Sequence, residues 1–301
     1  MRADKRFVAQ SKSFWAHVRS ISEALGYTER STSRIRTLTA ADITKAFKKL
    51  GLSSAHLVVN GQLSHLGEAL CAYFGYRATV LNDFVQPRLM DAAQAAELYE
   101  EMKARLKPRL AETMNKQSGD MKKVAYLTAL VNMIVESVAG FDGFNPNPGQ
   151  LTTFTRDSQP LRTLSRRVDG ALPGVVNPVA LWEIKEYYYT TTFGSRVADG
   201  VYETLLDGME LEEMREHEGR HVEHALIIDA HFTWWVKGRS YLCRIIDMLH
   251  MGYVDEVIFG REVVERLPAL VKEWVALARQ PAAEPKLRGE AEKQLRLVEE
   301  E

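Results

Sequence analysis

The chain has 301 residues, 46% apolar and 26% charged, with a formal net charge of −1. This composition is that of an ordinary globular protein with a sizeable core. No apolar run approaches the roughly 20 residues of a membrane span, and the first residues lack the apolar core of a signal peptide. We therefore expect a cytoplasmic protein with no membrane segment. The two cysteines, Cys71 and Cys243, lie in apolar helical patterns and are expected to be buried free thiols.

Residues 1–115 are predicted to form a mostly helical, basic N-terminal domain. Apolar periodicity predicts helices at 14–25 and 39–50, a short strand at 55–59, and helices at 66–74 and 91–110. The first 50 residues contain eleven Lys or Arg and only four Asp or Glu. A basic segment ahead of a mildly acidic body suits a surface that faces phosphates.

Two interpretations of this basic segment stay open. Helices separated by tight glycine breaks could form a helix-turn-helix or winged module, with Lys45, Lys48 and Lys49 on a helix near DNA. Alternatively, the helices form a cap packed on the second domain, and the lysines lie on a solvated face.

A second domain is predicted at residues 116–279, followed by a charged tail at 280–301. The composition turns polar around residues 115–120, which suits a domain boundary. The pattern then predicts a helix at 121–139, strands at 151–156, 161–169 and 179–191, a helix from 195, a strand at 225–232, a helix at 241–250, a strand at 253–259 and a helix at 267–278.

One constellation in this domain carries candidate chemistry. Glu183 and Lys185 are two apart in an apolar strand pattern, so their side chains share a face. Asp169 ends the preceding strand pattern and could reach the same point. Two carboxylates can hold a divalent metal while an ammonium stands beside its water, which is the minimum equipment for hydrolysing a phosphodiester. The alternative is a charged pair on the solvated face of an edge strand.

The order of predicted elements and this spacing together resemble the PD-(D/E)XK nuclease superfamily over about residues 121–260. The resemblance implies an α/β (α+β) fold, in which a restriction-endonuclease-like core with a central mixed sheet flanked by helices follows the helical N-terminal domain. It also implies a Mg²⁺- or Mn²⁺-dependent endonuclease of the restriction or defence kind that cuts double-stranded DNA.

The motif is carried over position by position. Asp169 and Glu183 correspond to the acidic positions that bind the metal, and Lys185 to the lysine that assists the attacking water. Glu136, on the helix before the first strand, corresponds to the extra acidic residue that many members place near the metal. Val168 stands where the family pattern has proline, and this departure removes one check on the assignment.

Further residues are candidates for DNA contact. Arg196 opens the next helix and could reach a phosphate, and Lys237 and Arg239 lie in a candidate loop. Cutting both strands at a symmetric site would favour a homodimer. A second hypothesis is a DNA-binding protein on the same fold that does not hydrolyse its ligand.

A competing motif comes later in the chain. His217-Glu218-Gly219-Arg-His221 matches H-E-x-x-H, in which two histidines on one helical face bind zinc and the glutamate activates water. His224 or Glu223 could supply a third ligand. Against a zinc metallopeptidase, the surrounding helix is acidic, the glycine weakens it, and the segment falls where the helix is expected to end.

Overall fold

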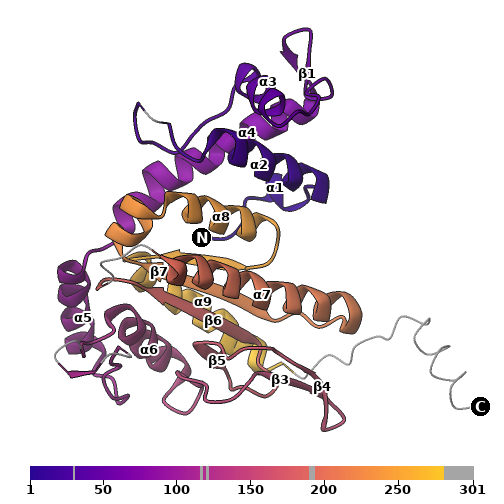
Figure 1. Cartoon of the computed structure of the whole chain (residues 1–301). Helices are drawn as coiled ribbons and strands as arrows, with labels where there is room; N and C mark the ends of the chain where they lie inside the picture. Colours follow the sequence, from indigo (N-terminus) through magenta and orange to yellow (C-terminus); the bar gives the residue numbers. More distant parts are fainter. Residues whose placement is uncertain (30, 116–117, 120–121, 190–193, 281–301) are drawn as a thin grey trace, which may run out of the picture.

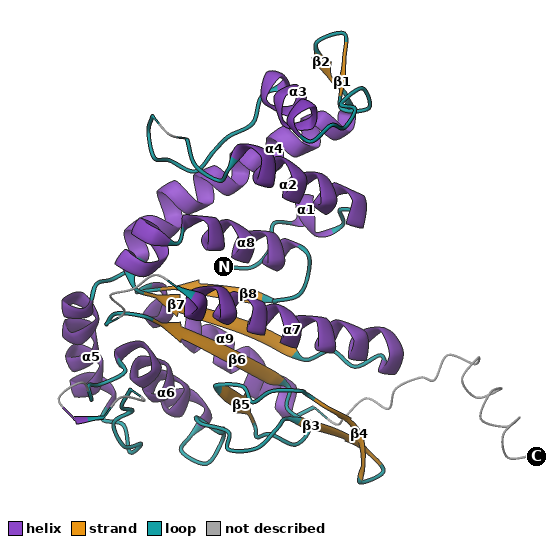
Figure 2. Ribbon diagram, viewed as in Figure 1, coloured by secondary structure: helices purple, strands orange, loops and turns teal. Residues whose placement is uncertain are grey.

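The computed structural model describes residues 1–280 except 30, 116–117, 120–121 and 190–193 (Figure 1). A group of N-terminal helices lies beside a β-sheet that has helices on both of its faces (Figure 2). In the part of the chain that is described, no helix is both long and apolar enough to cross a bilayer.

The N-terminal helices are amphipathic and pack around one aromatic core. They comprise α1 (Lys5–Val8), α2 (Lys12–Leu25), α3 (Ala40–Lys49) and α4 (His65–Thr79), with the small hairpin β1 (Val58–Val59) and β2 (Gln62–Leu63) before α4 and the turns η1 (Val80–Val85) and η2 (Gln86–Arg88) after it. Thr39 and Asp42 form a capping box that starts α3. The buried side chains of Phe14, Phe47 and Tyr73 join the three longer helices.

The central sheet is mixed, as the sequence predicts. Its strands are β5 (Gly170–Leu172), β6 (Ala180–Glu186), β7 (Glu223–Asp229) and β8 (Glu256–Phe259), in the spatial order β5-β6-β7-β8. β5 runs antiparallel to β6, whereas β6, β7 and β8 are parallel. The hairpin β3 (Thr153–Arg156) and β4 (Gln159–Thr163) precedes them.

Helices cover both faces of this sheet, so its inner strands are buried on both sides. One face carries α5 (Ala92–Leu106), α6 (Tyr126–Ala139) and α9 (Glu262–Ala278); the other carries α7 (Ser195–Glu218), η4 (Phe232–Lys237) and α8 (Arg239–His250). On the first face Trp182 of β6 stacks on Trp274 of α9, with ring centroids 5.5 Å apart. Burying each of these side chains stabilises the fold by about 2–3 kcal/mol.

Some elements differ from their predicted limits. The predicted strand at 161–169 is two strands, because β4 ends at Thr163 and β5 begins at Gly170. Between them the chain turns to α7, where the backbone N–H and hydroxyl of Ser165 donate to the Glu210 carboxylate. The predicted division at residue 115 falls after α5, but Tyr99 of α5 shares a core with α6.

The N-terminal helices pack on α8 through a buried charged group. Arg77 of α4 is fully buried, and its Nη1 donates to both carboxylate oxygens of Asp247 on α8, at 2.8 and 3.0 Å. Tyr73 donates to the same carboxylate. This packing is what the helical-cap interpretation expects, whereas a DNA-binding role of the same helices stays a prediction.

Candidate active site on strands β5 and β6

The two predicted acidic residues come together because β5 lies very close to β6. Gly170 pairs with Trp182, and a Cβ on this glycine would lie only 2.0 Å from the indole, so the position needs glycine. The N–H of Asp169 donates to the carbonyl of Trp182 at 3.2 Å. In return, the N–H of Ile184 donates to Oδ2 of Asp169 at 2.8 Å. The Asp169 carboxylate therefore lies against the strand segment that carries Glu183.

Glu183 and Lys185 point from β6 toward α7. The Glu183 side chain is fully buried, and Nζ of Lys185 donates to its Oε2 at 2.7 Å. The same Nζ donates to Oε2 of Glu203 on α7 at 2.9 Å. A Cβ on Gly200 of α7 would lie 3.1 Å from Cδ of Lys185, so this glycine leaves room for the lysine stem. The pair is buried between strand and helix, unlike the solvated edge-strand pair of the alternative interpretation.

Three residues that the sequence reasoning missed complete the cluster: Arg166, Glu203 and Asp207. Arg166, in the loop before β5, places Nη1 3.0 Å from Oε1 of Glu183 and Nη2 3.2 Å from Oε2. Its Nη2 also lies 3.3 Å from Oε2 of Glu203, and its Nη1 donates to Oδ2 of Asp207.

A signal for Asp207 is present in the sequence. Positions 200, 204, 207, 211 and 214 follow the spacing of one helical face, and all five are buried. An aspartate on that inward face needs a polar partner, because an unpaired buried carboxylate is costly. Arg166 and Glu203 carry no comparable local signal, since both are partly exposed.

The charges of the cluster act on one another. Burial alone would raise the pKa of Glu183, but the charges of Lys185 and Arg166 lower it below its ordinary value. Burial works against the charged form of Lys185, yet Glu183 and Asp169 outweigh it and raise the lysine pKa. Burial together with the charge of Glu183 raises the pKa of Asp207 to about 7. At neutral pH Lys185 is therefore a cation and cannot accept a proton.

Some buried acceptor atoms of this region lack a donor. Among the residues that the structure describes, Oε1 of Glu183, Oδ1 of Asp207 and Nε2 of His224 receive no hydrogen bond. His224 lies on β7, fully buried, and its Nδ1 contacts the carbonyl of Tyr253 at 2.9 Å. Desolvation lowers the pKa of His224, while the charge of Glu183 acts in the opposite direction. Acceptors left over in a buried site favour a proton or a cation as a partner.

Glu136 is engaged elsewhere. It lies on α6, and its carboxylate accepts hydrogen bonds from the backbone N–H groups of Arg109 at 2.8 Å and Leu110 at 3.1 Å. α6 packs against the face of the sheet that carries Trp182, opposite to the side chain of Glu183. These bonds give Glu136 a structural task, and they do not support its predicted place beside a metal.

The predicted DNA-contact residues fall in two places. Lys45, Lys48 and Lys49 are exposed on α3, which lies at the far end of the N-terminal helices from the sheet (Figure 1). Nζ of Lys49 donates to the carbonyl of Ala24 at 2.7 Å, which stabilises the end of α2.

The second group lies where β6 and β7 end. Arg196 is exposed in the first turn of α7. In and after η4, Nζ of Lys237 lies 5.6 Å from the ring centre of Phe232, and the Arg239 guanidinium lies 5.0 Å from that of Trp235. Paired cations and aromatic rings of this kind suit contact with phosphates and bases.

The H-E-x-x-H segment does not form one helical face. α7 ends at Glu218, and Gly219 takes a left-handed conformation with φ of 65°. His217 stays on the helix, where its Nδ1 contacts the carbonyl of Glu213. His221 lies beyond the turn, so the two imidazoles are not held at the i, i+4 spacing that the zinc motif requires.

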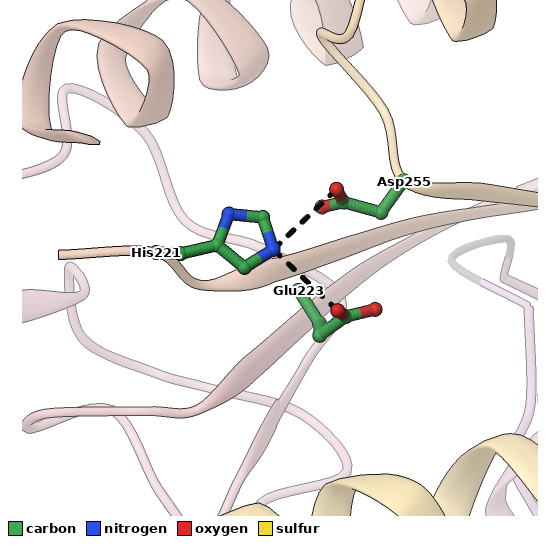
Figure 3. A group of neighbouring side chains, drawn as sticks. All are labelled: His221, Glu223 and Asp255. Carbon is green, nitrogen blue, oxygen red and sulfur yellow. Dashed lines mark ion pairs between the residues drawn. The ribbon is translucent and has the colours of Figure 1, made fainter. Parts of the chain in front are cut away.

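His221 instead joins two carboxylates at the start of β7 and β8 (Figure 3). Its Nε2 lies 3.4 Å from Oε1 of Glu223 and 3.5 Å from Oδ1 of Asp255. The hydrogen bond to Glu223 raises the pKa of His221, as expected for an ion pair. The three groups have ligand atoms within 4.8 Å of one another, but ion pairing accounts for their arrangement.

Comparisons with known proteins give a family without a known activity. A model described as "Domain of unknown function (DUF7690)" matches residues 1–84. No curated protein and no solved structure matches the chain. A second model, which covers more than half of the chain, matches residues 90–274, and the chain therefore belongs to the family described as "Domain of unknown function (DUF7687)".

Proposed function

We propose that this protein is a metal-dependent endonuclease that hydrolyses phosphodiester bonds of double-stranded DNA, in a restriction or defence role. The observation that carries the proposal is the convergence of Asp169, Glu183 and Lys185 at the β5–β6 pair. The Asp169 carboxylate lies against the backbone of β6, and the ammonium of Lys185 lies 2.7 Å from Oε2 of Glu183.

The arrangement of elements gives the proposal further support. A helix (α6), the antiparallel pair β5–β6, a crossover helix (α7) and the parallel strand β7 follow one another, with helices on both faces of the sheet. This is the order that a restriction-endonuclease-like core requires. A fold alone does not determine a reaction, so the proposal depends on the site.

The donor set fits a hard divalent cation such as Mg²⁺ or Mn²⁺. Asp169 and Glu183 offer carboxylate oxygens, which are the ligands that these ions prefer, and Oε1 of Glu183 is buried without a hydrogen-bond donor. When bound, such an ion would neutralise the phosphate and lower the pKa of a water molecule. Lys185 keeps its proton, so we assign it to orienting that water and stabilising negative charge, and not to accepting a proton.

DNA would reach the site from the end of the sheet where α7 begins. Arg196, Lys237 and Arg239 are the cations placed there, and the last two lie against aromatic rings. The lysines of α3 would contact a more distant part of the duplex. Cleavage of both strands would call for two copies of the chain.

The direct test is cleavage of supercoiled plasmid DNA with Mg²⁺ or Mn²⁺, by the wild-type protein and by Asp169→Asn and Glu183→Gln. We expect nicked or linear products from the wild type only, and none after chelation of the metal. Exposed Glu100→Gln on α5 is the control, because it changes the same chemical group outside the site. Unchanged cleavage by both site variants would refute the proposal.

One observation favours a second candidate, a DNA-binding protein without hydrolysis. Glu183 is already neutralised by Lys185 and Arg166, so its charge is satisfied without a metal. Such a protein would shift DNA in a gel with a strong dependence on salt and would leave the plasmid intact with either metal.

A further inference from the structure

The guanidinium of Arg166 occupies a cage of carboxylates. Four carboxylate oxygens, from Glu183, Glu203 and Asp207, lie within 3.3 Å of its Nη1 and Nη2. Two of the three carboxylates belong to α7 and the third to β6, so the cage is built on rigid elements. Arg166 itself comes from the loop between β4 and β5, and its side chain remains 22% exposed.

The cage has more negative charge and more acceptor atoms than its two cations use. Three carboxylates face Arg166 and Lys185, which leaves one negative charge uncompensated. Glu183 and Asp207 are fully buried, and each keeps one oxygen without a hydrogen-bond donor among the described residues. Burying unsatisfied carboxylate oxygens is costly, and an ion with several coordination positions would satisfy them.

We propose that Arg166 is a displaceable occupant of a divalent-cation site formed by Glu183, Asp207 and Glu203. The inference rests on the proposed function in placing a cation at Glu183, and it adds two ligands from α7 and an internal competitor. A dication in place of the guanidinium would bring the charge of the three carboxylates and Lys185 to zero. Because Arg166 reaches the cage from a loop and is partly exposed, its side chain can withdraw without moving β6 or α7.

The competition predicts a measurable change in metal affinity. A site that its own arginine fills most of the time binds metal more weakly, in proportion to the fraction of time that the site is open. Arg166→Ala should therefore bind Mn²⁺ at least about tenfold more tightly than the wild type. Binding would be followed by the electron paramagnetic resonance signal of free Mn²⁺, with Mn²⁺ as the only ligand.

Arg162 provides a matched control. It precedes the same loop, is 21% exposed, and pairs with Glu213 and Glu218 of the same helix, at 3.1 and 3.5 Å. Arg162→Ala should leave the Mn²⁺ affinity at the wild-type value. Adding Asp207→Asn to Arg166→Ala should remove the gain, because a ligand of the cage is lost.

Thermal unfolding with and without Mn²⁺ keeps the test decisive if Arg166→Ala is unstable. We expect its melting temperature to fall in metal-free buffer and to rise with Mn²⁺ by more than that of the wild type. An affinity equal to or below the wild-type value, or a variant that stays unfolded with Mn²⁺, would overturn the inference. Tighter Mn²⁺ binding without plasmid cleavage would support the site and count against the nuclease function alone.

Discussion

Replacing Lys185 with methionine tests the proposed chemistry most directly. Methionine keeps most of the apolar stem that packs beside Gly200 and removes the ammonium that contacts Glu183 and Glu203. Removing one preorganised donor from an active site typically lowers the rate about 10²–10³-fold, or about 3–4 kcal/mol of transition-state stabilisation. We expect a loss of this size in the rate of plasmid cleavage.

The same substitution also affects stability, and the assay has to separate the two effects. Removing one partner of a buried ion pair costs about 3–5 kcal/mol. Arg166 still lies 3.0 and 3.2 Å from the Glu183 oxygens, so we expect Lys185→Met to fall near the lower limit, about 3 kcal/mol. Urea denaturation would measure this cost, and cleavage would be compared at a temperature where both proteins are folded.

Lys103 offers a matched control. Its Nζ lies 2.7 Å from Oε1 of Glu112, the same separation as in the Lys185–Glu183 pair, but its side chain is 44% exposed. An exposed pair contributes at most about 1 kcal/mol, so Lys103→Met should change neither stability nor cleavage appreciably. Folded Lys185→Met that cleaves at the wild-type rate would refute the role of the ammonium, and equal losses in both variants would point to a general effect of lost charge.

Two further substitutions test the environment of the site. Gly170→Ala would place a Cβ 2.0 Å from the Trp182 indole, so we expect a loss of about 1–3 kcal/mol in urea denaturation, and a change under 0.5 kcal/mol would contradict the close approach of the strands. Burial raises the pKa of Glu186 from 4.5 to about 7, so the folded protein holds a proton there that the unfolded chain has released. This contribution to stability is complete below pH 4.5 and is lost as the pH rises to 7, by about 3 kcal/mol. Glu186→Gln should therefore flatten the decline of unfolding free energy over that range, whereas Glu100→Gln should not.

Local patterns were sufficient to predict the centre of the candidate site. The two-residue period of a strand puts Glu183 and Lys185 on one face, and that statement needs no knowledge of the rest of the fold. The position of Asp169 beside β6 required only that consecutive strand patterns pair. The order of helices and strands followed in the same way from periodicity, which is why the mixed sheet with helices on both faces was predictable.

Contacts between distant segments were not predictable. Arg166 meets Glu203 and Asp207 only because α7 crosses β6 at a particular height, and no local pattern encodes that height. The H-E-x-x-H match failed for a related reason, since the motif needs a continuous helix and Gly219 ends α7 within it. A motif of sequence letters carries no information on whether the backbone continues through it.

The buried Arg77–Asp247 pair links the two parts of the chain that match separate family models. Arg77 belongs to the segment matched over residues 1–84, and Asp247 to the segment matched over residues 90–274. Separating the parts would leave two charges without partners in a surface that is otherwise apolar, at a cost of several kcal/mol. The N-terminal helices are therefore held at a defined position relative to β6 and are not a loosely tethered module. If the lysines of α3 contact DNA, they do so at a set distance from Glu183, so that binding by one part would determine which phosphate reaches the other.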